Sequence, residues 1–244
     1  TSYISNAKLP RRNPDTQYNW RSTLPGNTSA TLWTEFKSEK ELPQYINPAS
    51  GYLYNTNHSP FLATDPAYNL DANRYDKNDG FERSHNNRSQ RVTELVQGIG
   101  KIDYTTVRRI KFDQQLPQQL QYPYGIDSMM NLNAAEYPSL KVVITSLQQW
   151  NKKATADSRG AAVFLLTYEY VAGRLRGTAP RQLTKDEAIE TYQYVNDYML
   201  RYFKRNDLVL GDIQKLVRGN DARPAWGIPD VLTAAYTDTY KDGL

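Results

Sequence analysis

The most apolar part of the chain is residues 161–175, which read AAVFLLTYEYVAGRL. Drawn as a helix, this segment carries apolar side chains on most of its sides, which is typical of a helix buried on all sides. A break at Asp157 and Ser158 precedes it. The segment therefore predicts a central helix, starting after residue 158, against which neighbouring helices pack.

The segments on either side of this stretch carry helical patterns with one apolar stripe each. Pro138 stands where a helix can begin, and Thr184 to Glu187 have the form of a capping box. Apolar residues then recur three or four positions apart, as expected for one face of a helix. They are Leu140, Val143, Ile144, Leu147 and Trp150 in the first segment, and Ile189, Tyr192, Val195, Met199 and Tyr202 in the second.

Helical periodicity begins at residue 86. Asn87 is predicted to cap a helix, and Asp103 is predicted to cap the next one. Residues 86–206 are thus expected to form a mainly α-helical region. Residues 1–85 are rich in proline, glycine and asparagine turn signals, and residues 207–244 return to the same punctuation.

Short strands are expected at both ends of the helical region, so the fold class is α+β. The pieces at residues 3–4, 31–33 and 52–54 fit strands or extended segments. We interpret residues 1–85 as a turn-rich strand and loop region. Residues 86–206 form the helical region, and residues 207–244 form an irregular return segment.

Composition excludes several classes of function. The 244 residues contain no cysteine, which excludes disulfides and thiolate chemistry. With only two histidines, His58 and His85, a histidine-rich metal cage is not expected. A net charge of +4 is too small to indicate nucleic-acid binding. No window approaches the roughly 18 apolar residues of a membrane span, which predicts a soluble protein without a membrane partner.

Common catalytic motifs are absent from the sequence: no phosphate-binding glycine loop, GxSxG elbow or HExxH pair occurs. Asp76 and Asp79 could form an acid–base or calcium-binding pair, although a solvated acidic loop is the simpler interpretation. A basic group around residues 101–111 has the spacing of a solvated helix face. It consists of Lys101, Arg108, Arg109 and Lys111.

Residues 42–61 form the most distinctive segment, with a tight turn at 47–51, a short apolar piece and then Asn55, Thr56 and Asn57 before His58. A side-chain amide carries two N–H donors, which could stabilise a developing oxyanion. Asparagines in turns also often bond the local backbone instead. The residues alone leave both interpretations open.

The order of several motifs resembles the penicillin amidase (penicillin acylase) family of N-terminal-nucleophile hydrolases, which includes cephalosporin and acyl-homoserine-lactone acylases. The specific part of the resemblance runs from Tyr18 to Pro60 and includes LPG at 24–26, TLW at 31–33, ELP at 41–43, NPASG at 47–51 and NTNHSP at 55–60. Weaker matches follow at 91–95, 147–151, 157–161, 211–214 and 218–219. The resemblance spans nearly the whole chain.

This resemblance implies specific roles for two residues. Asn57 corresponds to the asparagine whose side chain donates to the oxyanion, and Arg91 to an arginine that supports this asparagine and the substrate pocket. His58 and Asn55 would be scaffold. The fold implied is an αββα sandwich, and the reaction is hydrolysis of the amide bond of an N-acyl compound by an N-terminal serine whose own amino group is the base.

The matching residues correspond to the middle of the nucleophile-bearing β subunit. We therefore expect an internal segment that lacks the nucleophile and is inactive alone. Its partners would be the α subunit, the N-terminal β segment and a small N-acyl substrate. Thr1 and Ser5 are weaker candidates for the nucleophile. The resemblance also implies a periplasmic or secreted protein, no cofactor for catalysis, and room for a structural calcium ion in the full enzyme.

A different class of function remains open: a non-catalytic, helical binding domain. The chain has 19 tyrosines against 6 phenylalanines, and tyrosine supplies amphipathic contact area at interfaces. The orientation of the Asn57 amide separates the two hypotheses. An amide that bonds only its own turn favours the binding domain, and an amide that points into an open cleft near the first strand of the chain favours the acylase.

Overall fold

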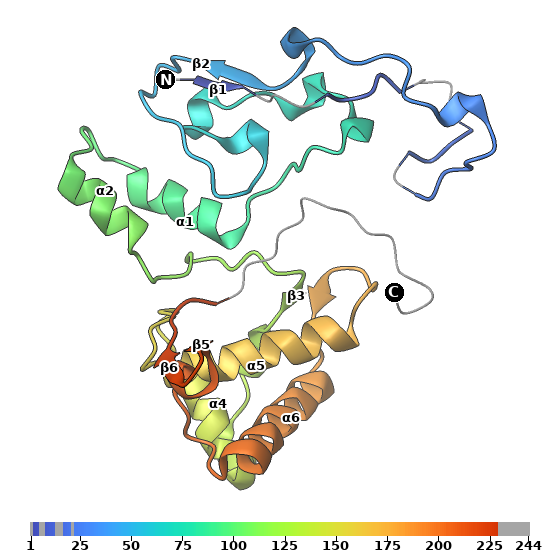
Figure 1. Ribbon diagram of the computed structural model, residues 1–244. Coiled ribbons are helices and arrows are strands. Elements are labelled where there is room, and N and C mark those ends of the chain that lie inside the picture. Colours follow the sequence, from blue (N-terminus) through green and yellow to red (C-terminus); the bar gives the residue numbers. More distant parts are fainter. Residues whose placement is uncertain (1, 5–7, 13–16, 21, 229–244) are drawn as a thin grey trace. The chain divides into compact units, whose positions relative to one another are not determined.

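The computed structural model describes residues 2–4, 8–12, 17–20 and 22–228, which fall into two compact units (Figure 1). The N-terminal unit comprises the described residues up to Thr93, and the helical unit begins at Glu94. The division lies within helix α1 (Asn87–Val96), beyond the boundary predicted between residues 85 and 86.

The helical unit is arranged around α5 (Arg159–Arg174), which contacts α4 (Lys141–Gln148), α6 (Lys185–Phe203) and α7 (Leu210–Ile213) (Figure 1). The Ser158 hydroxyl caps α5 by accepting a hydrogen bond from the Ala161 backbone N–H at 3.1 Å. The prediction of a central buried helix after residue 158 is confirmed. The smaller elements of the same region are α3 (Asp127–Met130), η7 (Ala134–Glu136) and η8 (Pro138–Leu140).

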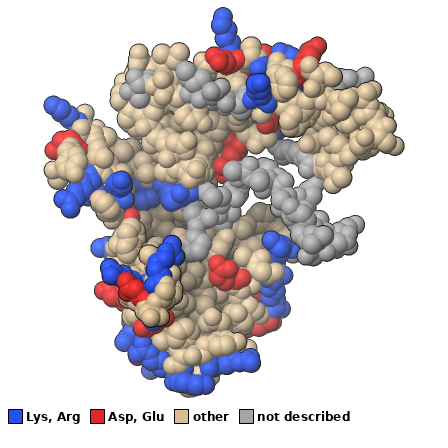
Figure 2. Space-filling model, viewed as in Figure 1, with Lys and Arg blue, Asp and Glu red and all other residues tan. Residues whose placement is uncertain are grey.

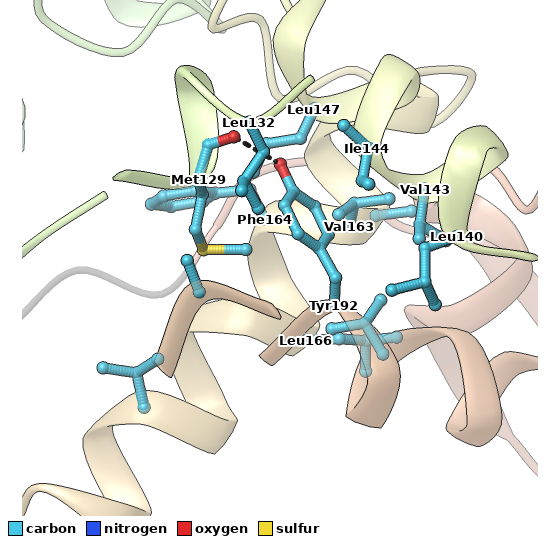
Figure 3. Close-up of a cluster of buried hydrophobic side chains, with 14 of the residues drawn as sticks. Met129, Leu132, Leu140, Val143, Ile144, Leu147, Val163, Phe164, Leu166 and Tyr192 are labelled. Atoms are coloured by element: carbon cyan, nitrogen blue, oxygen red, sulfur yellow. Dashed lines mark hydrogen bonds between the residues drawn. The ribbon is translucent and has the colours of Figure 1, made fainter. Parts of the chain in front are cut away.

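The core of the helical unit consists of the predicted stripes of α4 and α6 packed on α5 (Figure 3). Val143, Ile144 and Leu147 are completely buried. Tyr192 is also buried, and its hydroxyl donates to the carbonyl of Met129 at 3.1 Å. Fully burying each such side chain stabilises the fold by roughly 1.5–3 kcal/mol.

The prediction that Tyr202 belongs to the buried stripe of α6 is wrong. Tyr202 is 60% exposed, because it lies in the last turn of α6, where Phe203 packs against the core in its place. The capping box at the start of α6 is confirmed: the Thr184 hydroxyl accepts from Glu187 N–H, and the Glu187 carboxylate accepts from Thr184 N–H.

Helix α2 (Tyr104–Lys111) starts as predicted, because the Asp103 carboxylate accepts from Thr106 N–H at 2.7 Å. Helix α1 differs from the prediction. Asn86 is its N-cap residue and Asn87 is its first helical residue, since Asn86 Oδ1 accepts from Ser89 N–H at 2.8 Å. The four basic residues at 101–111 are exposed, and basic side chains gather over this part of the surface in Figure 2.

The N-terminal unit contains one small sheet and a series of 3-10 turns. Strand β1 (Ser2–Ile4) pairs antiparallel with β2 (Gln44–Ile46), which confirms the strand predicted at residues 3–4. The 3-10 turns are η1 (Ser29–Thr31), η2 (Glu39–Glu41), η3 (Pro60–Leu62), η4 (Pro66–Tyr68), η5 (Ala72–Arg74) and η6 (Lys77–Asp79).

Of the two alternatives predicted at residues 31–33 and 52–54, strands or extended segments, neither piece forms a strand. Thr31 ends the turn η1, and residues 52–54 pair with no neighbouring strand among the described residues. The Tyr52 carbonyl instead accepts from the Thr64 hydroxyl at 2.8 Å, and Tyr54 N–H donates to the Ala63 carbonyl. One side-chain hydrogen bond and one backbone hydrogen bond from the following loop thus take the place of the hydrogen bonds of a β-sheet.

Four short strands lie in the helical unit. Strand β3 (Tyr124–Gly125) runs parallel to β4 (Arg181–Gln182), and β5 (Lys215–Arg218) forms an antiparallel hairpin with β6 (Asp221–Pro224). The hairpin gives regular structure to part of the segment predicted as an irregular return. Helices and short strands together are compatible with the α+β class.

Candidate active site

A turn at residues 55–57 places the Asn57 side chain. The Asn55 Oδ1 atom accepts from Asn57 N–H at 2.7 Å, and Asn57 has a positive φ of 55°. Asparagine tolerates this left-handed conformation better than most residues. The left-handed backbone of Asn57 is therefore favoured by the asparagine residue type and by the hydrogen bond that its N–H donates to Asn55. The Asn57 side chain remains available for other contacts.

Asn86 fixes the same turn to the start of α1. Its Nδ2 atom donates to the carbonyls of Thr56 at 3.0 Å and Asn57 at 2.9 Å, and its Oδ1 atom caps the helix through Ser89 N–H. Asn86 is only 3% exposed. One buried amide thus satisfies the backbone of the turn and the helix together.

The Asn57 side chain bonds outside its own turn. Its Oδ1 atom accepts from Nη1 of Arg88 at 3.3 Å. A guanidinium only donates hydrogen bonds, so the oxygen of the amide must face Arg88 and the nitrogen must face away. No described residue accepts from the Asn57 Nδ2 atom, and the residue is exposed. Two N–H donors are therefore available to a bound molecule.

Arg91, the arginine expected to support Asn57, lies one turn further along α1 and is half-buried. It has interactions of its own. The hydrogen bond that the structure shows on the Asn57 side chain comes from Arg88, so the role of Arg91 stays a prediction. Sequence reasoning missed Arg88 and Asn86, and the only signal for Asn86 was its place beside the predicted cap.

His58 is buried directly behind the turn. Its Nδ1 atom accepts from Thr56 N–H at 3.2 Å, which leaves Nε2 to donate to the Leu62 carbonyl at 3.0 Å. Burial lowers the pKa of His58 below its usual value. The ring is therefore neutral near pH 7, with its proton on Nε2, and it bridges two parts of the loop by hydrogen bonds to the backbone of Thr56 and Leu62.

His58 belongs to a column of stacked rings that ties the loop to α1. Its ring stacks on that of Tyr54 with 4.8 Å between the ring centroids and on that of His85 with 6.2 Å. The Tyr54 hydroxyl bonds Thr93 Oγ1 at 3.0 Å, and His85 Nδ1 bonds Ser89 Oγ at 2.9 Å. Burial raises the pKa of Tyr54 and lowers that of His85. All three rings are therefore uncharged near neutral pH.

The acidic loop beyond the turn has structural contacts. Asp65, Asp71 and Asp76 each cap a 3-10 turn by accepting from a backbone N–H at 2.8–2.9 Å. The Asp79 side chain is 3% exposed and forms an ion pair with Lys37 at 2.6 Å. Within the part of the chain that the structure describes, no three His, Asp or Glu side chains gather as a metal site.

The remaining candidates for the nucleophile, Thr1 and Ser5, lie outside the described residues. Across the described ranges, no helix combines the length and the apolar composition that crossing a bilayer requires.

Comparison with protein families places the chain among the N-terminal-nucleophile hydrolases. A sequence model of the penicillin amidase family matches residues 1–242, nearly the whole chain, and the chain therefore belongs to the penicillin amidase family. Membership of this family implies an acylase, a hydrolase that acts on amide bonds. The resemblance first noted in the motifs at 18–60 is thus confirmed.

Proposed function

We propose that the protein acts in the hydrolysis of the amide bond of a small N-acyl compound, with Asn57 donating a hydrogen bond to the oxyanion. One observation carries this proposal: the Asn57 amide is held by Arg88 through its oxygen, so that its nitrogen faces away. An amide fixed in this way is preorganised for negative charge that develops on a substrate oxygen.

In the proposed reaction the hydroxyl of an N-terminal serine attacks the substrate carbonyl carbon, and the serine's α-amino group takes the hydroxyl proton. The carbonyl oxygen becomes an oxyanion that accepts from Asn57 Nδ2. Collapse breaks the C–N bond, and the amino group passes the proton to the leaving amine. Water then hydrolyses the acyl ester. In this proposal the serine belongs to a part of the enzyme other than this chain, so the 244-residue chain is expected to be inactive alone.

Arg88 contributes to this step through Asn57. A positive group on the amide oxygen draws electron density away from the amide nitrogen, which makes its N–H groups better donors. The uncharged column of Tyr54, His58 and His85 supports the loop without adding a competing charge. Arg91, further along α1, is proposed to support Asn57 and to line the substrate side of the pocket.

The competing function, a non-catalytic tyrosine-rich binding domain, receives less support. A purely structural Asn57 would be expected to bond its own turn, but Asn55 already performs that task. The Asn57 side chain instead pairs with an arginine 31 residues away in the sequence. Such long-range positioning of an exposed amide is more easily explained by a ligand than by turn stability.

The wider setting is part of the same proposal. Strands β1 and β2 would belong to an αββα sandwich completed by the α subunit and the N-terminal β segment, and the enzyme would be periplasmic or secreted. No cofactor takes part in the proposed step. A calcium ion would be structural and would use ligands from elsewhere in the enzyme in addition to this chain.

The proposal is tested with Asn57→Ala in the complete enzyme, assayed with a panel of chromogenic N-acyl anilides. Losing one oxyanion donor lowers kcat by about 10²–10³. Asn57 is exposed but has a positive φ, which alanine tolerates less well than asparagine, so the free energy of unfolding should fall by about 1–2 kcal/mol. Asn47→Ala is the matched control, since Asn47 is another exposed asparagine of the N-terminal unit with a positive φ of 46°. Full turnover in Asn57→Ala would remove Asn57 from the mechanism.

A further inference from the structure

Helix α2 of the helical unit presents most of its surface to solvent. None of its residues is buried, and only Thr106 and Ile110 are partly buried. These two residues lie on one side of the helix, since they are four positions apart. A surface helix normally buries an apolar stripe against its own core, whereas α2 buries no side chain fully. The remaining sides of α2 are therefore open to contact with another surface.

The open sides of α2 carry large apolar side chains. Tyr104 is 81% exposed, Val107 is 50% exposed, and Phe112, which follows the last residue of the helix, is 56% exposed. Ile102, just before the helix, is also exposed. Single exposed apolar residues are common, but four in and around one short helix form a patch that an apolar partner would stabilise by removing it from water.

Three cations without ion-pair partners lie beside these apolar side chains. Arg108, Arg109 and Lys153 line one hollow of about 590 Å³, and Phe112 lines it with them. Lys153 comes from a distant part of the sequence and is held there by the backbone, because Ala154 N–H donates to the Gln114 carbonyl at 2.9 Å. All three cations are exposed, and none forms an ion pair within the described part of the chain.

The charge around the hollow is positive (Figure 2). Lys101 and Lys111 add two more exposed cations. The carboxylates of the same stretch have other contacts: Asp103 caps α2 through Thr106 N–H, and Asp113 has interactions of its own. An anionic partner would therefore be attracted to this surface.

We define the α2 surface as Tyr104, Val107, Arg108, Arg109, Phe112 and Lys153. Its mixture of cations and apolar side chains narrows the choice of partner. An acidic protein would satisfy the cations, but it would also need a preformed groove to receive apolar side chains that project from a helix. A lipid bilayer needs no such groove, because its acyl chains are fluid and its anionic headgroups lie directly above them.

We propose that the α2 surface binds the face of an anionic phospholipid bilayer. Its three cations pair with lipid phosphates, and its three apolar side chains insert between the headgroups and the upper acyl chains. The expectation of no membrane partner rested on the absence of a spanning segment, and contact with the bilayer face requires no spanning helix. The proposal does not depend on the reaction proposed at Asn57.

Vesicle flotation of the 244-residue chain and of the complete enzyme tests the charged part of the proposal. We expect binding to vesicles made of equal parts of phosphatidylglycerol and phosphatidylcholine, much weaker binding to phosphatidylcholine alone, and release at high salt. Arg108→Gln combined with Arg109→Gln should weaken binding about thirtyfold, since each cation near the bilayer contributes about fivefold. Arg176→Gln combined with Arg218→Gln is the matched control, because it removes the same charge from exposed positions elsewhere in the helical unit. It should change binding less than about twofold.

Phe112→Ser tests the apolar part and should weaken binding about tenfold, because the ring no longer leaves water. Phe36→Ser, which alters an exposed phenylalanine of the N-terminal unit, is its control and should leave binding unchanged. In Phe112→Trp the fluorescence gained over the unmodified chain should shift to shorter wavelength when anionic vesicles are added. Circular dichroism confirms that each variant is folded. If the double arginine variant unfolds, Lys153→Gln outside the helix replaces it and should weaken binding about fivefold.

Several results would overturn the proposal. They are equal binding to neutral and anionic vesicles, and unchanged binding by folded Phe112→Ser or by the folded arginine variant. Binding by the chain but not by the complete enzyme would overturn it too, because another part of the enzyme would then cover α2. Release from vesicles by glycerol 3-phosphate would indicate a site for free phosphate, and equally tight binding to polyglutamate would indicate an acidic protein partner. Either result would also contradict a bilayer contact.

Discussion

The two units of the molecule differ in the interactions that stabilise each of them internally. The helical unit has a core of apolar side chains drawn from three long helices, including Leu147, Phe164 and Met199. The N-terminal unit is built of short 3-10 turns capped by side chains, with one small sheet. Apolar burial is not directional, whereas hydrogen bonds fix positions. The unit built on hydrogen bonds is the one that carries the candidate active site.

The largest expected effect is a loss of stability in the helical unit when a buried apolar side chain is removed. Leu147→Ala removes a completely buried side chain and should lower the free energy of unfolding of the helical unit by about 2–5 kcal/mol. Chemical denaturation measures this change. Val142→Ala on the same helix is the control, since Val142 is 40% exposed and should cost far less. Equal losses in the two variants would show that α4 does not owe its stability to the buried stripe.

A smaller effect is expected on the hydrogen-bonded side. Asn86→Ala removes the cap of α1 and the clamp on the turn at residues 55–57, and should cost about 1–3 kcal/mol. Asp103→Ala removes a cap alone from α2 and should cost less stability than Asn86→Ala. The Asn86 variant should also lower kcat in the complete enzyme, while the Asp103 variant should not. A stable, fully active Asn86→Ala enzyme would contradict the clamp.

The smallest effect distinguishes the units by pH. Burial lowers the pKa of His58 and His85, so the unfolded state binds more protons than the folded state as the pH falls below about 6.5. The N-terminal unit should therefore lose stability from about pH 6.5 down to the folded pKa values, by at most about 1.4 kcal/mol per pH unit for each histidine.

The helical unit contains neither histidine and should respond in a lower pH range. Its Glu187 has a pKa lowered to about 2 by hydrogen bonds from Arg181 and Thr184. The stability contributed by this exposed carboxylate is present above the usual glutamate pKa and is lost as the pH falls towards 2. Hydrogen exchange of amides in each unit measures both profiles. A common profile in both units between pH 5 and 7 would contradict the assignment to the histidines.

Much of the helical unit could be predicted from the sequence, because its helices are specified by local patterns. The stripe at Val143, Ile144 and Leu147 and the capping box at Thr184 follow from residue spacing alone. The cap of α1 was displaced by one residue, since Asn86 and Asn87 are equally good caps in isolation. Asn86 becomes the cap because it is buried against the carbonyls of Thr56 and Asn57, and this contact is tertiary and not visible in the sequence.

The candidate site was predictable only in part for the same reason. The resemblance directed attention to Asn57, and the structure shows its amide turned away from its own turn. The partner, Arg88, could not be derived from the sequence, because the contact joins the turn at residues 55–57 to the first turn of α1, 31 residues away, and depends on how α1 begins. The tyrosines at 52 and 54 alternate as in a strand, and nothing in the sequence indicates that the Thr64 hydroxyl and the Ala63 carbonyl bond this backbone in place of a neighbouring strand.

The central claim is that Arg88 acts on the reaction through the Asn57 amide. A double-mutant cycle on kcat in the complete enzyme, with Asn57→Ala, Arg88→Ala and both together, tests it most directly. We predict that Arg88→Ala slows the enzyme when Asn57 is present and has almost no further effect when Asn57 is alanine. Independent, multiplicative losses in the double variant would contradict the account.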